Sequence, residues 1–572
     1  MKNKEIAKIF RNMAVLLEIK GDLIFKIRAY ERAALTLENL DEDVENLYEQ
    51  GNLDGLAGIG EKLKGKIIEY IKTGKIQSYE DKKKKIPVDV EELSKVAGIG
   101  PKTILKLYRR LKVKNMQELE DAAKKQKIRS IKGLGPVVEQ NILKNIQFAK
   151  TSSERSLLGD AIAVSEKIKA ELKKLKDVEK IEIAGSVRRR KETIRDIDVL
   201  VASKNHSKII DAFTNLQGVQ RILAKGQTKS SIRIEGIQAD LRVVNENIFG
   251  AALLYFTGSQ QHNIHLRKIA IKKSMKLSEY GIFDKETNKL LASKTEEECY
   301  RKLDLSYVEP EIREDTGEIE IAMKNNLPKL VEINDIKGDL QMHTKYSDGN
   351  NSILEMAQEA EKLGHEYILI TDHLGKAGMG NAMDESKLHE QKKEIEETAK
   401  KVKIKILQGA EVNIQTDGSI DIGDKVLKDL DIVIGSIHFG FKKSKEINTK
   451  RLLKAIENEN VDIIGHPTGR LLNERQGMEL DFDEILDKAK ATKTILEINA
   501  LPKRLDLSDV HIKAAVKEGV KLSIGTDSHD SIMLKNHIFG VYTARRGWAT
   551  KNDIINTRSL KDMLKMLKKR IL

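Results

Sequence analysis

Seven short apolar segments follow one another at regular spacing in the C-terminal part of the sequence. Each one ends among polar residues, and together they cover residues 338–343, 367–373, 405–411, 431–438, 461–467, 494–500 and 521–529. Their ends lie about 30 residues apart, which is the length of a β-strand followed by a helix. Seven such units predict an α/β barrel whose chemistry lies at the C-terminal ends of the strands.

The polar residues at these predicted strand ends are of the types that bind metals. They are His343, His373, Glu411, His438, His466, Asp527 and His529, with Asp348 in the loop after the first strand. A lone histidine at a strand end is more often structural, but five of the chain's 12 histidines occupy equivalent ends here. Imidazole with carboxylate favours Mn²⁺, Zn²⁺ or Fe²⁺ over Mg²⁺. Two or three such ions could activate water against a phosphate ester.

The motifs H-T-x-x-S-D-G, T-D-H, G-x-E, S-x-H, G-H-P and T-D-S-H occur in this order over residues 337–572. They resemble the PHP domain, a metal-dependent phosphoesterase on a distorted barrel of seven βα units. That family usually opens with H-x-H, whereas this sequence has Gln341 two residues before His343. The departure puts the occupancy of one metal position in question. Arg470, just after G-H-P-T-G, is either a phosphate clamp or an ordinary surface arginine.

A second acidic group lies on predicted strands nearer the N-terminus. Asp196 and Asp198 alternate with Ile197 and Val199, so both carboxylates point to one face of a strand. Asp240 lies on another predicted strand and could stand beside them. Converging carboxylates repel one another unless cations neutralise them, and oxygen ligands suit Mg²⁺ or Mn²⁺. Because a lone D-x-D is more often an exposed strand edge, the neighbouring motifs decide between the two interpretations.

Those neighbouring motifs are G-S-V-R-R-R at 185–190, D-L-R at 240–242 and Y-F-T-G-S at 255–259. In this order and spacing, the first 318 residues resemble the family X DNA polymerases, which include DNA polymerase beta. Two positions depart from polymerase beta. Arg195 replaces a glycine before the D-x-D, and Gln238 replaces an arginine beside the third aspartate.

The resemblance implies roles for individual residues. The three aspartates would hold the catalytic metals, and Asp240 would help to orient or deprotonate the primer 3′-OH. Residues implied to bind the incoming nucleotide and its base pair are Gly185, Ser186, Arg189, Tyr255, Phe256, Gly258, Asn263 and Arg267.

Three similar glycine turns recur in the N-terminal part, at 56–67, 96–108 and 131–142. Each has an apolar residue, a G-φ-G turn (φ apolar) and a helical pattern, which is the helix-hairpin-helix arrangement. Such a turn brings the backbone and a helix N-terminus close to a phosphate. The predicted DNA contacts are Gly58, Gly60, Gly98, Gly100, Gly133 and Gly135. Residues 51–150 hold 23 Lys/Arg against 12 Asp/Glu, a balance that suits nucleic acid, although a generally Lys-rich chain would also explain it.

The first of these turns also resembles the 5′-deoxyribose-phosphate lyase domain of the polymerase family. The resemblance places Lys66 at the Schiff-base lysine and Lys62 at a phosphate-binding neighbour. Lysine is abundant throughout the chain, and Phe25 stands where polymerase beta has a DNA-contacting histidine. DNA binding is therefore the first expectation for this segment, and lyase chemistry the second.

The predicted fold is multidomain, combining α+β and α/β parts. It has helical helix-hairpin-helix domains, a polymerase beta-like palm and thumb, and a C-terminal distorted (βα)7 PHP barrel. The expected boundaries are an N-terminal lyase-like helical domain at 1–85, a fingers-type domain at 86–155, a palm at 156–260, a thumb at 261–318, a linker at 319–336 and the barrel at 337–572.

Several classes of protein are excluded. No apolar run reaches the roughly 18 residues of a membrane span, and the N-terminus has the charges of an amphipathic helix. The single cysteine, Cys299, cannot form an internal disulfide, which indicates a cytoplasmic protein. We expect a monomer that binds gapped or primer-template DNA and dNTPs.

The two resemblances together imply a family X DNA polymerase that fills short gaps in DNA repair, as in base excision repair. The PHP barrel would act as a 3′-5′ exonuclease and could also cut at abasic sites. One alternative is a DNA repair nuclease whose polymerase half mainly binds and positions gapped DNA. A non-catalytic DNA-binding scaffold is a second alternative. The metal ligands present at both sites disfavour it, and only Gln341 supports it, in the barrel. A small-molecule phosphatase would leave the first 318 residues without a role.

Overall fold

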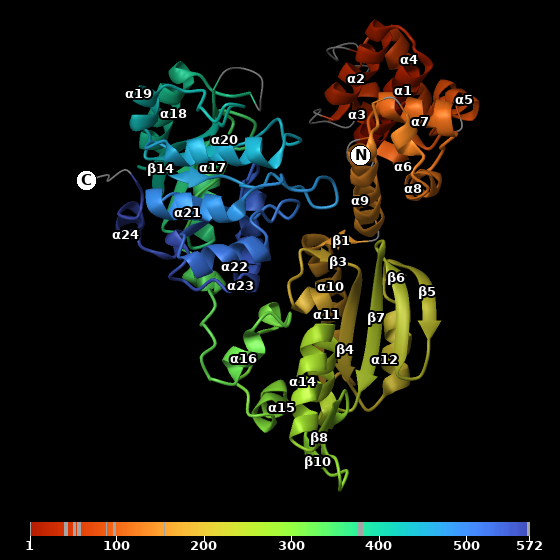
Figure 1. Ribbon diagram of the computed structural model, residues 1–572, viewed down its shortest axis with the longest axis vertical. Helices are drawn as coiled ribbons and strands as arrows, with labels where there is room; N and C mark the ends of the chain where they lie inside the picture. The colour runs from red at the N-terminus through yellow and green to blue at the C-terminus, as the bar shows by residue number, and fades with distance from the viewer. Residues whose placement is uncertain are drawn as a thin grey trace. The chain divides into compact units, whose positions relative to one another are not determined.

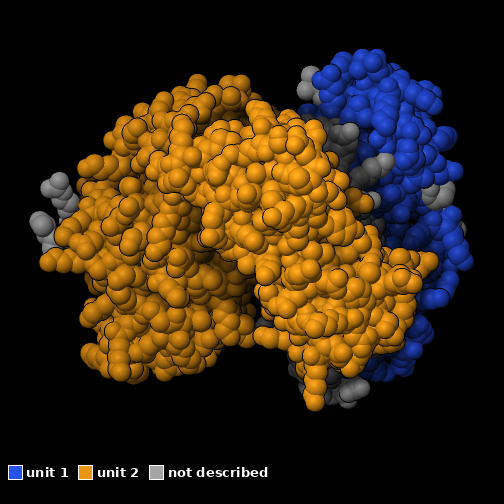
Figure 2. All heavy atoms as spheres, turned by 90° about the horizontal axis from the view of Figure 1, so that it is seen from below, with its two compact units in different colours: residues 1–154 blue, residues 155–572 orange. Residues whose placement is uncertain are grey.

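The computed structural model describes the chain except for residues 1, 39–43, 50–52, 54–58, 87, 95, 97–98, 132, 154, 376–380 and 569–572. The chain divides into two compact units, residues 1–154 and 155–572 (Figure 2). Each unit is described separately below.

The first unit is helical. Its helices are α1 (Lys2–Lys20), α2 (Ile24–Glu38), α3 (Val44–Glu49), α4 (Glu61–Thr73), α5 (Gln77–Lys85), α6 (Val90–Ser94), α7 (Pro101–Leu111), α8 (Met116–Lys124) and α9 (Pro136–Ser153). They enclose two apolar clusters. One gathers residues of α1 to α5, and the other gathers residues of α1 and of α6 to α9. Three of the helices, α4, α7 and α9, begin directly after the second glycine of a G-φ-G turn, as the sequence predicts.

The palm opens the second unit with a five-stranded sheet in the order β2-β4-β7-β6-β5, of which Figure 1 shows β4, β7, β6 and β5 side by side. The strands are β2 (Lys180–Ile183), β4 (Asp196–Ala202), β5 (Val219–Lys225), β6 (Lys229–Ile234) and β7 (Ile237–Val244). A short pair, β1 (Ser156–Leu157) and β3 (Thr193–Ile194), lies outside this sheet.

Strand β4 shows how alternation places the palm's aspartates. Its Ile197, Val199 and Val201 are buried in a cluster with helices α10 (Leu158–Lys173) and α12 (His206–Thr214). Leu200 and Ala202 are buried in another cluster, with helix α13 (Phe249–Thr257). Since side chains alternate along a strand, Asp196 and Asp198 lie on the face that α13 covers.

The thumb combines helices with a three-stranded antiparallel sheet. Its elements are α14 (Gln260–Lys272), β8 (Met275–Ser278), β9 (Gly281–Asp284), β10 (Leu290–Ala292), α15 (Glu296–Lys302) and α16 (Glu318–Ala322). The stretch 319–336, predicted as a linker, is packed against this domain. Its Ile319, Ala322 and Leu330 are buried in the thumb cluster, together with Trp548 from the barrel.

The barrel contains the seven predicted strands, all parallel and in sequence order. They are β11 (Gly338–Asp339), β12 (Tyr367–Ile370), β14 (Lys405–Asn413), β15 (Ile432–Ser436), β16 (Ile463–Ile464), β17 (Ile495–Asn499) and β18 (Leu522–Gly525). A short β13 (His373–Leu374) pairs with β14. A parallel bridge between Met342 and Ser528 joins the first and last strands beyond their ends, which nearly closes the barrel.

Helices cover the outside of the barrel. They are α17 (Ile353–Lys362), α18 (Glu385–Thr398), α19 (Asp424–Lys428), α20 (Lys445–Glu457), α21 (Phe482–Thr492), α22 (Asp509–Glu518) and α23 (His537–Arg546). Apolar residues of α18 to α23 share one cluster with the strands. The segment around α24 (Leu560–Leu564) packs Met563 and Leu567 against strand residues such as Tyr367 and Leu369.

Candidate active sites

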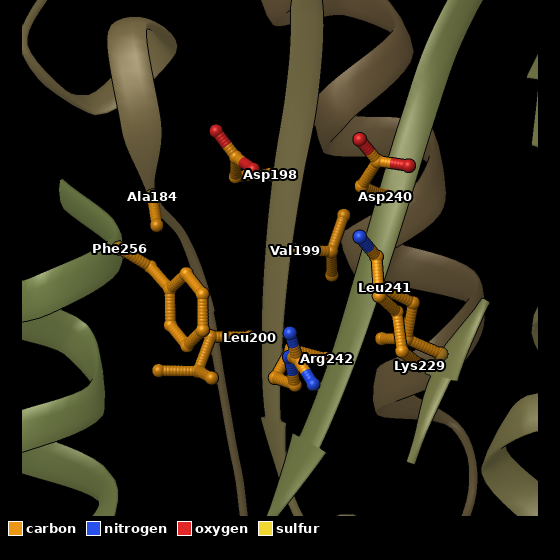
Figure 3. A pocket seen from close by; sticks show the side chains of 9 residues that line it. All are labelled: Ala184, Asp198, Val199, Leu200, Lys229, Asp240, Leu241, Arg242 and Phe256. Atoms are coloured by element: carbon orange, nitrogen blue, oxygen red, sulfur yellow. The ribbon is translucent and has the colours of Figure 1, made fainter. Parts of the chain in front are cut away.

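The palm aspartates meet on two neighbouring parallel strands. Asp198 of β4 stands opposite Asp240 of β7, and Asp196 stands opposite Gln238. Figure 3 shows the Asp198 and Asp240 side chains at one end of a pocket, with the amine of Lys229 pointing toward them. Burial, followed by the nearby charges of Asp196 and Asp240, raises the pKa of Asp198 to about 7. The site therefore resists holding its full negative charge unless a cation is bound.

Gln238 interacts with the third aspartate. Its Nε2 donates to both carboxylate oxygens of Asp240, at 3.3 and 3.1 Å. The amide therefore fixes the orientation of Asp240 without adding the charge of an arginine. The other departure, Arg195, is exposed.

The glycine–serine turn lies directly beside Asp198. Short helix α11 (Gly185–Arg188) follows β2, and Ala184 N donates to Asp198 O at 2.8 Å. Gly185 has φ +59°, and a Cβ built on it would overlap Asp198 Oδ2. A glycine is therefore required at this position on both conformational and steric grounds.

The end of α13 and the start of α14 form another wall near Arg189. Gly258 has φ +69°, and a Cβ there would lie 3.1 Å from Arg189 Nη1. Asn263 Nδ2 donates to Tyr255 O at 2.7 Å, and the Arg242 guanidinium lies 5.3 Å from the Phe256 ring. Ser186 on the turn is half-buried, and Arg267 on α14 is exposed.

The glycine turns of the first unit leave their backbones open. Gly60, Gly100 and Gly135 have no atom within 4 Å of a Cβ built on them, and Gly133 has φ +87°. Gly58 and Gly98 lie outside the described residues. On α4, Lys62 is exposed, whereas Lys66 is half-buried and donates from Nζ to Ser78 Oγ.

The barrel brings all eight predicted ligand side chains into one cluster. Glu411 is its centre, with His466 Nε2 at 3.0 Å, His438 Nε2 at 3.2 Å and His373 Nδ1 at 3.4 Å from its carboxylate oxygens. His343 Nε2 lies 3.3 Å from Asp527 Oδ1. On the other side of the cluster, His529 Nε2 lies 3.4 Å from Asp348 Oδ2.

The donor atoms of this cluster fit bound metal ions. They form three sets, and the donor atoms within each set all lie within 4.8 Å of one another. The sets are His343 with Asp348, His373 and His529; His373 with Glu411 and His438; and His343 with Glu411 and Asp527. Both ring nitrogens of His343 are buried without a hydrogen-bond partner among the described residues. Such buried, unpartnered nitrogens are costly in a protein interior unless a metal binds them.

Nearby charges shift the pKa values of the candidate metal ligands, and hydrogen bonds fix their orientation. Despite burial, His529 and His343 hold the pKa of Asp348 at about 2. Burial alone would lower the pKa of His529, but Asp348 and Asp527 raise it to about 9. His438 Nδ1 is 2.8 Å from Asn413 Oδ1, which directs Nε2 toward Glu411. Outer hydrogen bonds of this kind fix the orientation of a metal-binding histidine.

Gln341 occupies a fully buried position at this site. When the Gln341 side-chain amide is oriented so that its oxygen and its nitrogen both have suitable hydrogen-bond partners, Nε2 donates to Glu497 Oε2 at 2.9 Å. Glu497 Oε2 also accepts from His466 N at 2.6 Å. Burial, with the nearby charges of Asp527 and Glu411, raises the pKa of Glu497 well above its usual value. Sequence analysis missed Glu497, although a glutamate inside the apolar segment 494–500 was an available signal.

The structure distinguishes between two arginines near the barrel site. Arg470, the predicted phosphate clamp, donates to Arg504 O at 3.0 Å, to Leu505 O and to Glu192 Oε2 at 2.8 Å. It therefore supports a loop and a contact with the palm. Arg504, which sequence analysis did not select, has its Nε 3.3 Å from Asp527 Oδ2.

Comparisons with known proteins agree with this architecture. The matching family descriptions are "Helix-hairpin-helix domain" at residues 1–76, "SAM-like Helix-hairpin-helix tandem" at 90–147, "DNA polymerase beta thumb" at 252–314 and "PHP domain" at 339–501. No helix in the described ranges is both long and apolar enough to cross a membrane.

The fold thus defines a polymerase of the beta type that also contains a PHP barrel. A protein named DNA polymerase/3'-5' exonuclease PolX, from Bacillus subtilis strain 168, is 38% identical over 573 residues, which cover 100% of both chains. A probable phosphatase of Thermoanaerobacter sp. strain X514 is 33% identical over 248 residues, covering 41% of this chain and 96% of the phosphatase. The chain belongs to the PolX family.

Proposed function

We propose that this chain is a DNA-directed DNA polymerase that fills short gaps and a 3′-5′ exonuclease that trims DNA ends. The observation that supports it best is the pairing of Asp198 with Asp240 on adjacent strands, beside the Gly185 turn. A second cluster of imidazoles and carboxylates lies in the barrel of the same unit. Two sites with different ligand chemistry suit two different reactions on DNA.

In the palm, Asp196, Asp198 and Asp240 would hold Mg²⁺ or Mn²⁺. Bound ions would supply the charge that steadies the attacking oxygen and the leaving phosphate. The protein's own residues orient the reactants. Asp240, held by Gln238, faces the primer 3′-OH, and the backbone and hydroxyl of the Gly185–Ser186 turn, with Arg189, bind the triphosphate. Tyr255 and Phe256 line the nucleotide sugar, and Asn263 and Arg267 face the nascent base pair.

In the barrel, the histidines and carboxylates would hold Mn²⁺, Zn²⁺ or Fe²⁺ and supply an activated water for hydrolysis of a phosphodiester. The Arg504 guanidinium, beside Asp527, is placed to bind the scissile phosphate. The exposed glycine turns of residues 1–155 would grip backbone phosphates without reading sequence. Lys66 would be available for lyase chemistry only after leaving Ser78. The gap-filling and exonuclease activities would serve DNA repair in the cytoplasm.

The test uses a 5′-labelled primer on a one-nucleotide-gapped duplex with Mn²⁺, with and without dNTPs. We expect Asp198→Ala to lose extension but keep shortening, and His438→Ala to lose shortening but keep extension. Shortening by the wild-type protein without any extension would favour the alternative, a repair nuclease whose polymerase half only positions gapped DNA. Extension without shortening would contradict the exonuclease proposal.

A further inference from the structure

Arg546, in the last turn of α23, connects the barrel to the nucleotide-binding turn of the palm. Its side chain is 4% exposed. It donates to Arg189 O at 2.7 Å, to Glu311 O at 3.2 Å, to Glu314 Oε1 at 3.1 Å and to Asp509 Oδ2 at 2.5 Å. One buried guanidinium therefore joins the palm, the end of the thumb and the start of barrel helix α22.

Arg189 contacts the same carboxylate oxygen of Glu314 as Arg546 does. Its Nε lies 3.2 Å from Glu314 Oε1, and its Nη1 donates to Thr257 O. These contacts engage Nε and Nη1, which leaves Nη2 as the group that can face a triphosphate. Glu314 thus holds Arg189 in place, and Arg546 holds Glu314.

The energetics favour a fixed geometry for this network. A buried guanidinium is costly unless charged partners neutralise it. Here burial lowers the pKa of Arg546, but Asp509 and Glu314 outweigh it, so that its pKa is raised. Burial raises the pKa of Glu314, yet Arg546 and Arg189 lower it overall. The carboxylates therefore stabilise both arginines, whereas burial and then the charge of Arg546 lower the pKa of Arg189, which makes Glu314 the partner on which Arg189 depends.

The packing around Arg546 anchors its helix to the palm. Phe539 of α23 is buried in the palm cluster, and a Cβ on Gly159 of α10 would lie 3.4 Å from its ring. Arg470 reaches Glu192 on the palm at 2.8 Å, and Asn473 Nδ2 donates to Arg155 O at 2.7 Å. Together these contacts hold the barrel against the palm that contains the Arg189 turn.

We propose that Arg546 is a positioning residue for nucleotide binding, by which the barrel holds Arg189, through Glu314, in the orientation that receives the triphosphate of a dNTP. The inference rests on the proposed polymerase activity. It gives the barrel a second role, since part of the polymerase site is then built by barrel residues. The histidines and carboxylates of the barrel site are not part of this network.

The test compares steady-state single-nucleotide gap filling by full-length wild type, Arg546→Met and Arg546→Lys. For Arg546→Met we expect the dNTP KM to rise about tenfold or more, with a smaller change in kcat and an unchanged Kd for gapped DNA. Shortening of a labelled single strand should stay at the wild-type rate. Arg546→Lys keeps the charge and should recover part of the KM.

Lys513→Met is the matched control. Lys513 crosses the same boundary, donating to Thr316 O at 2.7 Å and to Thr316 Oγ1 at 3.0 Å, but it has no contact with Arg189 or Glu314 among those found. We expect it to keep the wild-type dNTP KM. If Arg546→Met does not fold, Asp509→Asn takes its place, since it removes one charge partner but keeps the shape, and it should raise KM in the same direction.

A dNTP KM equal to that of wild type in folded Arg546→Met, or in folded Asp509→Asn where that variant takes its place, would overturn the inference. So would an equal loss of extension and single-strand shortening, which would indicate a general structural role. Absence of extension by the wild-type protein would instead contradict the proposed polymerase function, so the two failures can be told apart.

Discussion

Gly185 shows how a single residue can set the geometry of the palm site. It combines φ +59° with a close approach to the Asp198 carboxylate. In Gly185→Ala the new methyl must displace Asp198 or the turn, so we expect primer extension to fall by about 100-fold, as for a misplacement of about 1 Å. Single-strand shortening should be unchanged, because the barrel ligands are untouched.

The control is Gly236→Ala, in the turn between β6 and β7. Gly236 also has a positive φ, +81°, but nothing lies within 4 Å of a Cβ there. The two variants share a backbone strain of about 1–2 kcal/mol, and only Gly185→Ala adds a clash. Equal extension by both variants would show that the approach to Asp198 does not matter.

A second prediction at the scale of single residues concerns Arg504 in the barrel site. Its guanidinium is adjacent to the ligand Asp527 and 17% exposed. Arg504→Met should slow shortening of a 5′-labelled single strand by about 100- to 1000-fold, the range for a lost charge-stabilising donor, with normal primer extension. Lys503→Met is the control, because Lys503 is exposed and lies 3.7 Å from Glu474. A rate for Arg504→Met equal to that control would exclude a role in phosphate binding.

The eight barrel ligands could be predicted because residues at the ends of parallel strands converge, whatever the helices between them do. The palm aspartates follow from strand alternation in the same way. Glu497 and Arg504 could not be found by these rules. Glu497 lies within a strand, and Arg504 lies in a loop whose path depends on tertiary contacts such as Asn499 N to Asp506 O at 2.6 Å. The same loop draws Arg470 toward its carbonyl groups and away from the metal ligands.

At the scale of elements, Glu296 joins three segments. Its carboxylate binds Arg188 of α11 at 2.6 Å and Arg313, near the end of the thumb, at 2.6 Å. Burial would raise the pKa of Glu296, but Arg313 and Arg188 lower it from 4.5 to about 2. A lowered folded-state pKa contributes stability that is present above about pH 4.5 and is lost as the pH falls toward 2.

We therefore expect Glu296→Gln to cost about 3–5 kcal/mol at pH 7, because it leaves buried arginines without their counter-charge. The difference from wild type in thermal unfolding should shrink below pH 4.5. Glu246→Gln, which breaks the exposed pair with Lys180 at 3.2 Å, should cost less than about 1 kcal/mol at any pH. A pH-independent difference for Glu296→Gln would contradict the assigned charge.

Elements with strong periodicity were predicted well, and connections were predicted less well. The seven barrel strands and the palm strands β4 and β7, which carry the three aspartates, lie where alternation and apolar runs place them. The stretch 319–336 is predicted as a linker containing Pro328, yet its Ile319, Ala322 and Leu330 are buried in the thumb core. That packing depends on Trp548, which is more than 200 residues away in sequence, so no local pattern could reveal it.

At the scale of the second unit, the sequence left open whether the barrel packs against the polymerase or swings on its connector. The structure has palm and barrel residues in one apolar cluster, which includes Phe539 at 8% exposure. Phe539→Ala should therefore cost about 3–5 kcal/mol and lower the unfolding temperature of palm and barrel together.

Calorimetry, with extension and shortening assayed after stepwise heating, measures this coupling. We expect both activities of Phe539→Ala to be lost at the same reduced temperature, because a shared core unfolds as one cooperative unit. Ile532→Ala, at a side chain 71% exposed, should change stability by less than about 0.5 kcal/mol. Loss of shortening at a lower temperature, with extension surviving to the wild-type temperature, would mean that the barrel unfolds alone and that the palm does not depend on it.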